Sequence, residues 1–322
     1  YAGATPPDVS GLACANPVFG KTYSFSAGSG SIAVTIGTAA SGAAIWSATG
    51  GGAWSTAGNW LVPPANAAGS QARFDSAILA PATVTTAGET VGEMYFANAN
   101  AYTLGGSGLA FDNDGAPARI SVERGAHAIA APLTLADDVA LELAGGTQLD
   151  LGAVSGATAT ISAQGAGALQ LSAAPMVDTL ALNGPSVAFK ESMTVSPKVV
   201  LARDAVFAPA TGKSVALAGV VSGDAGLTKT GSSTLALEAD NSYSGATRVN
   251  GGTLLADSLA NGGQPSAIGA STAAGANLQL LSGTFRYSGQ AVETDRSFTV
   301  DAGSGSAAMF AVDHALTLNG PV

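Results

Sequence analysis

Short segments in which apolar and small polar residues alternate recur along nearly the whole chain. Gly, Asn-Gly, Asp or Ser interrupts them roughly every ten residues, and these residue types turn a backbone at low cost. No window keeps the apolar spacing of a helix, so the pattern predicts an all-β chain of short strands. We expect strands within 31–37, 82–86, 101–106, 140–154, 159–164, 168–173, 179–184, 214–223, 234–241, 252–256, 277–289 and 315–320.

One strand type is used repeatedly, with Leu at every second position and Gly close behind, as in LELAG, LDLGA, LALNG and LTLNG. A sandwich, a barrel or a solenoid accepts this rhythm. The composition favours the solenoid, because only 6% of residues are aromatic and 43 are Gly, and small aliphatic side chains fill a narrow interior. At about 20 to 25 residues per coil, residues 45–322 predict roughly twelve coils in a rod about 60 Å long. We expect residues 256–276 to form a loop projecting from one corner.

Two stretches resemble a known family. The ordered positions of the first stretch resemble the passenger-associated repeat of autotransporter β-helices: Gly226 to Gly231, Thr234, Leu235, Leu237, Asn241, Tyr243, Gly245 and Val249 to Leu254. GTFRYSG (283–289) and the positions Thr294, Asp295, Arg296 and Phe298 resemble the segment that follows this repeat. Upstream, the second stretch resembles the Trp-rich opening of such passengers at Trp46, Trp54, Asn59, Trp60, Pro63, Pro64 and Phe74.

This resemblance implies a right-handed parallel β-helix, secreted or exposed at the cell surface in association with the outer membrane. We expect three parts: an extended N-terminal arm (1–44), Trp-rich first coils that cap the rod (45–97), and the β-solenoid proper (98–322), which includes the repeat at 226–256. The sequence ends in the strand pattern ALTLNGPV. We therefore expect either a fragment of a longer passenger or a solenoid that uses these repeats without transporting itself.

The net charge and the cysteine count limit which binding partners, disulfides and metal clusters are expected. With 12 Lys+Arg against 22 Asp+Glu the net charge is -10, which disfavours nucleic acid as a partner. Cys14 is the single cysteine, so no internal disulfide and no cysteine metal cluster forms. Cys14 is interpreted as a spare thiol in the arm, with a bridge to another chain as the alternative.

Residues with catalytic or ligand-binding chemistry are few. His127 and His314 stand alone, without a second histidine at metal-ligand spacing, and we expect His314 at a coil corner beside Asp313. TGKS (211–214) has Phe207 where the first glycine of a phosphate loop should stand. Both patterns are therefore interpreted as structural.

An acidic cluster and the tryptophans offer the alternatives. On pectin-acting β-helices, carboxylates from neighbouring coils bind calcium or act as acid and base, so the acidic residues are candidates for a glycan lyase or hydrolase. They are Asp112, Asp114, Asp137 and Asp138, with Arg119 beside them. The simpler explanation is that Asp initiates turns. The three tryptophans are candidates for a sugar-stacking platform, although packing at the end of the rod explains them as well.

The alternation in the repeat predicts the direction of individual side chains. Leu235, Leu237, Val249 and Leu254 should point inward, and Lys229, Glu238 and Arg248 should face water.

We expect a structural or adhesive β-solenoid at the cell surface, with no enzymatic activity and no catalytic, cofactor or metal site. The alternatives are a β-helix glycan-active enzyme and a glycan-binding module. Surface glycans are possible partners. The chain is another possible partner for itself, through end-to-end stacking or addition of an N-terminal strand, and in that case it would be a filament subunit.

Overall fold

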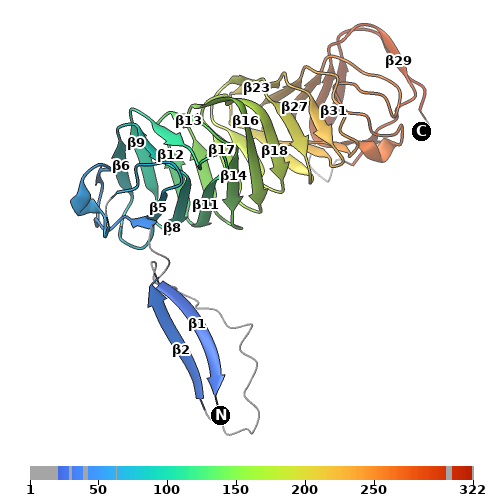
Figure 1. The fold of residues 1–322 in the computed structure, drawn as a ribbon. Coiled ribbons are helices and arrows are strands. Elements are labelled where there is room, and N and C mark those ends of the chain that lie inside the picture. The colour runs from blue at the N-terminus through green and yellow to red at the C-terminus, as the bar shows by residue number, and fades with distance from the viewer. Residues whose placement is uncertain (1–20, 29–30, 39–42, 63, 302–306, 321–322) are drawn as a thin grey trace.

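The computed structural model describes residues 21–28, 31–38, 43–62, 64–301 and 307–320. From residue 43 onward these residues form a rod of stacked coils, about 11 turns long (Figure 1). All pairings between named strands of the rod are parallel. The parallel β-solenoid predicted from the sequence is therefore confirmed. No helix among these residues is long and apolar enough to cross a membrane.

The first face of the rod is one continuous parallel sheet. Each strand between the two end strands pairs with the equivalent strand one coil earlier and one coil later. Its strands are β3 (Ala43–Ile45), β5 (Gln71–Phe74), β8 (Glu93–Ala97), β11 (Ala118–Arg124), β14 (Val139–Leu143), β16 (Val154–Gly165), β18 (Met176–Asn183), β21 (Lys198–Leu201) and β24 (Val221–Gly223).

The second face follows directly after each strand of the first. Its strands are β4 (Gly52–Ala53), β6 (Ala82–Thr86), β9 (Tyr102–Gly106), β12 (Ala126–Ile129), β15 (Gln148–Leu151), β17 (Ala168–Leu171), β19 (Ser186–Phe189), β22 (Ala205–Pro209), β25 (Leu227–Thr230), β27 (Thr247–Ala256), β28 (Leu278–Tyr287) and β30 (Thr299–Val300).

The third face closes each coil. It contains β7 (Glu89–Val91), β10 (Leu109–Phe111) and β13 (Leu133–Leu135), then the first residues of β16 and β18. Further along come β20 (Met193–Val195), β23 (Ser214–Leu217), β26 (Thr234–Leu237), the last residues of β27 and β28, and β31 (Ala308–Val312). Near the C-terminal end, β29 (Val292–Thr294) pairs with β32 (Leu316–Leu318), and two 3-10 turns complete the structure, η1 (Ala57–Asn59) and η2 (Gly275–Asn277).

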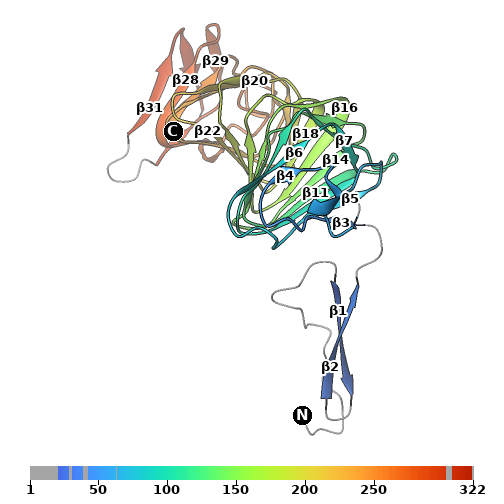
Figure 2. The same ribbon diagram turned by 90° about the vertical axis from the view of Figure 1, so that its left-hand side faces the viewer.

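Figure 2 looks along the rod, with the coils stacked one behind another. The interior is filled by rows of inward side chains that follow the strand register from coil to coil. On the second face one such row follows the strand register through Leu149, Leu169, Val187, Phe207, Lys229, Val249 and Leu280. Because each coil pairs with the coils on either side, backbone hydrogen bonding is satisfied along the rod while each coil buries only a few side chains. This explains a long chain with few aromatic residues.

The N-terminal end of the rod has a different core. Trp46, Trp54 and Trp60 are at most 5% exposed and surround Phe74, with ring centroids 5.6 to 6.1 Å from it. Their indole N–H groups donate to backbone carbonyl oxygens, for example from Trp54 to Ala65 at 2.7 Å. The expected packing role of the tryptophans is confirmed, and no ring face remains open for a sugar.

The predicted N-terminal strand is present, although not as a single extended arm. Strands β1 (Lys21–Gly28) and β2 (Ser31–Thr38) pair antiparallel as a two-stranded sheet of their own. Figure 1 shows this hairpin standing clear of the coils. Cys14 lies outside the described residues, and the domain boundaries expected from the sequence stay predictions.

The prediction that Lys229 faces water is wrong. Leu235, Leu237, Val249 and Leu254 are buried as expected, but Lys229 is also 0% exposed. Its Nζ donates to the carbonyl oxygens of Thr230 (2.7 Å), Gly231 (3.0 Å) and Gly251 (3.2 Å). Strand alternation places residues 227 and 229 on the same inner side, and the carbonyl oxygens of two successive coils supply the polar partners that allow an ammonium group there. Glu238 is exposed as predicted, and Arg248 points outward to an ion pair with Asp204.

The insertion at 256–276 is also corrected, because it does not project as a free loop. Ala267 and Ile268 are at most 1% exposed, and residue 266 forms an antiparallel bridge with Asn241. The guanidinium of buried Arg296 donates to the carbonyl oxygens of Ala260 (2.8 Å) and Gly269 (2.9 Å), and also to Ser271 and Gln264. The insertion therefore packs against its coil and is held by polar side chains of the repeat and of the segment after it.

Candidate binding surface

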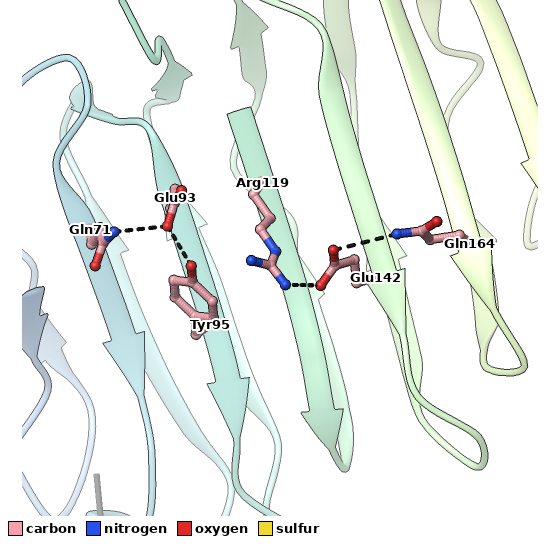
Figure 3. A network of polar contacts seen from close by, with 6 residues as sticks. All are labelled: Gln71, Glu93, Tyr95, Arg119, Glu142 and Gln164. Carbon is pink, nitrogen blue, oxygen red and sulfur yellow. Dashed lines mark hydrogen bonds and ion pairs between the residues drawn. The ribbon is translucent and has the colours of Figure 1, made fainter. Parts of the chain in front are cut away.

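The outward side chains of the first face form a polar ladder across consecutive coils. Gln71 donates to Glu93 at 2.9 Å, and the Tyr95 hydroxyl donates to the same carboxylate. Arg119 forms an ion pair with Glu142, and Gln164 reaches the other oxygen of Glu142 at 3.4 Å (Figure 3). Neighbouring strands in register bring these residues together. We call the residues joined by these contacts the polar ladder: Gln71, Glu93, Tyr95, Arg119, Glu142 and Gln164.

Electrostatics hold the N-terminal half of this ladder in place. The guanidinium of Arg73 lies 4.5 Å from the ring centroid of Tyr95 and that of Arg119 lies 5.5 Å from it. Burial, together with the hydrogen bond to Glu93, raises the pKa of Tyr95 to about 12. The hydrogen bond to Glu142 raises the pKa of Arg119. The tyrosine is therefore neutral and covered by two cations, so it is not an open stacking surface.

The ladder continues through Glu142 and Gln164 into a groove of about 590 Å³, where the first face meets the second. Its wall follows one outward row of the register, Ser121, Glu142, Gln164 and Asn183, with one residue from each of four coils. Arg203 lies at the far end. We call this feature the first-face groove.

Small residues at the turns make the groove possible. Gly165 has φ 104° and Gly184 has φ 107°, a backbone conformation that residues other than glycine rarely adopt. A Cβ atom on Gly165 would lie 2.1 Å from the carbonyl oxygen of Leu143. Successive turns therefore stack closely, and with Ala144 and Ala166 they leave a low floor between polar side chains.

The aspartates predicted as candidates do not enter this groove. Asp137 accepts hydrogen bonds from the backbone N–H of Asn113 (2.6 Å) and Gly115 (3.3 Å), and Asp138 accepts one from Thr160 (2.8 Å). These two carboxylates face a separate depression of about 240 Å³. Their contacts are those expected of turn residues.

The other two aspartates belong to the same corner. Asp112 accepts a hydrogen bond from the backbone N–H of Asp114 at 3.0 Å, and Arg119 points instead to Glu142 in the ladder. The structure therefore separates Arg119 from the acidic cluster. No group of three or more His, Cys, Asp or Glu side chains suited to a metal ion occurs within the described ranges.

Both histidines lie in structural settings. His127 is 2% exposed, its Nδ1 accepts from the Tyr102 backbone N–H at 3.0 Å, and its Nε2 lies 2.7 Å from the Arg124 carbonyl oxygen. Burial lowers the pKa of His127. His314 is exposed at the bend between β31 and β32, beside Asp313 as predicted. In TGKS (211–214), which connects β22 and β23, the Lys213 ammonium pairs with Glu191.

Sequence reasoning did not identify the groove residues. Glu142, Gln164 and Asn183 each look like ordinary outward positions of a strand, and only their repetition at one strand position in successive coils could have indicated a common surface.

Comparison with known proteins agrees with this architecture. Residues 227–256 match the family described as Passenger-associated-transport-repeat. A curated relative, the adhesin BmaC autotransporter of Brucella suis biovar 1 (strain 1330), is 51% identical over 78 residues. That match covers 24% of this chain and 2% of the relative, so the chain spans only a small part of that protein. No solved structure matches.

The stacked parallel coils form a β-solenoid, and the matched repeat lies within its coils, over β25, β26 and β27. The chain is therefore a β-solenoid that carries a passenger-associated transport repeat and is similar to an autotransporter adhesin over 78 residues.

Proposed function

We propose that this rod is a non-catalytic adhesive segment of a cell-surface protein. The observation that carries the proposal is the 51% identity over 78 residues to a protein named as an adhesin. The fold supports it, because a solenoid presents long faces whose outward residues can vary without disturbing the interior.

The chemistry of the surface supports a binding role over catalysis. A glycan lyase or hydrolase on this fold would need a shallow groove lined by several aspartates, with Arg or Lys on adjacent coils. The first-face groove has no aspartate in its lining, and Glu142 already accepts from Arg119 and Gln164. Hydrogen-bonding side chains on a rigid sheet are suited to holding a ligand.

The test is adhesion of beads coated with the full chain to a panel of cultured cells. Beads coated with the same chain after thermal unfolding are the control. We expect the folded chain to retain several times more beads under flow than the unfolded chain. Equal retention on every cell type would contradict an adhesive role.

A further inference from the structure

We propose that the first-face groove binds a neutral oligosaccharide chain lying along the rod axis. The inference rests on the proposed adhesive function and names the chemical class of its partner. It is carried by the shape, hydrogen-bonding capacity and charge of the groove.

The first observation is the regular spacing of polar side chains. Ser121, Glu142, Gln164 and Asn183 occupy one outward row on four successive coils, about 4.8 Å apart. Ser121 is only 6% exposed, so the accessible part of the row runs from Glu142 to Asn183 and extends for about 10 Å along the rod. A linear ligand with a repeating pattern of hydroxyl groups meets one polar side chain per coil.

The second observation concerns hydrogen-bonding capacity. Gln164 and Asn183 are exposed amides, each with an acceptor oxygen and two N–H donors. Within the described part of the chain the Asn183 side chain makes no hydrogen bond, and Gln164 makes only the 3.4 Å contact with Glu142. Amides that donate and accept together match hydroxyl groups, which do the same.

The third observation is the shape of the floor. Ala166, Gly165 and Gly184 bring no bulk, so a flat ligand can approach the backbone between the polar walls. At Ala166 the side chain is exposed, so the floor can be filled by substitution without entering the core.

Other ligand classes fit less well. A peptide cannot add as a strand, because β14, β16 and β18 are each paired on both sides. The groove lining also offers no large apolar pocket to anchor a peptide side chain. Polyanions are disfavoured by the net charge of -10 and by Glu123 and Glu142 in the lining, against which Arg203 is the one cation of the groove.

The experiment probes the full chain on an array of immobilised neutral hexose and N-acetylhexosamine oligosaccharides, together with sialylated and sulfated counterparts. We expect binding to neutral members and not to the anionic counterparts. Isolated sites of this kind bind weakly, with Kd on the order of 1 mM, so the chain is presented multivalently on beads.

Two variants and two matched controls localise the site. The double variant Gln164→Ala with Asn183→Ala removes the amides, and Ala166→Trp fills the floor. Each should lower array binding at least about tenfold. Gln170→Ala, on the outward side of β17, and Ala218→Trp, at an exposed turn on another face, should bind as wild type. Far-ultraviolet circular dichroism confirms the strand content of each variant.

Several results would overturn the inference: no neutral oligosaccharide binds, only anionic members bind, the groove variants bind as wild type, or the controls lose as much binding. The bead assay separates this failure from failure of the proposed function. If the beads adhere to cells but the array shows no binding, the proposed glycan site is wrong and the adhesive function stands. If array binding depends on the groove but the beads do not adhere to any cell, the glycan site stands and the adhesive function is wrong.

Discussion

The buried ammonium of Lys229 provides a sharp test of how the repeat is stabilised. The side chain is 0% exposed, between Phe207 and Val249 in an interior row, and its polar contacts are three backbone carbonyl oxygens. Burial lowers the pKa of Lys229 from 10.5 to about 8. Folding therefore favours the neutral amine relative to the unfolded chain.

The sign of the pH dependence follows from these two values. Below pH 8 the amine is protonated in both states, and the folded state bears the full cost of the buried charge. Between pH 8 and 10.5 the unfolded chain binds more protons, so the free energy of unfolding rises with pH. Integrated over this window, the contribution is about 3 kcal/mol.

The substitution Lys229→Met keeps most of the volume and removes the titrating group. We expect the difference in the free energy of unfolding between wild type and variant to change by about 3 kcal/mol from pH 8 to pH 10.5. Over this window the wild type gains stability relative to the variant. Taking this difference cancels the ionisation of tyrosines, which affects both proteins equally.

The measurement is urea unfolding followed by far-ultraviolet circular dichroism at several pH values. Hydrogen exchange of β25 and β27 backbone amides supplements it, because solenoid coils can open locally. Lys198→Met, at an exposed lysine, controls for the loss of one positive charge. A constant difference between wild type and Lys229→Met across this pH range would refute the reasoning.

Three further predictions concern other parts of the chain. Leu237→Asp should lower the free energy of unfolding by at least about 3 kcal/mol in urea denaturation, while Glu238→Lys should change it by less than about 0.5 kcal/mol, and equal effects would contradict the assigned faces. Arg296→Met should release the insertion, so limited proteolysis of the native variant should cut within 257–276 well before it cuts the wild type, and identical cleavage would contradict the anchoring role. Deleting residues 1–42, which leaves β3 of the rod in place, should abolish concentration-dependent growth in light scattering if the hairpin joins neighbouring chains, and a full-length chain that is monomeric at high concentration would exclude that assembly.

Much of the fold could be read from local sequence. Alternation of Leu with small polar residues specifies which side of a strand is buried, and Gly, Asn and Asp specify where the chain turns. Leu235, Leu237 and Leu254 confirm this, since each is buried where the pattern placed it. The repeat itself also carried enough ordered positions to indicate the passenger class.

The stacking of coils decided what the pattern could not. A charged side chain normally stays in water, which predicts an exposed Lys229, whereas the carbonyl oxygen of Gly251 on the next coil makes its burial possible. The insertion at 256–276 lacks strand alternation, so nothing local revealed that Arg296 would hold it against the rod. The groove also arises from the stacking of coils. The length of chain between stacked positions varies from coil to coil, as the groove pairs Glu142↔Gln164 and Gln164↔Asn183 illustrate, so a fixed repeat length does not reveal which residues become neighbours. Sequence therefore determined the direction of most side chains, and only the register between coils determined which of them became neighbours.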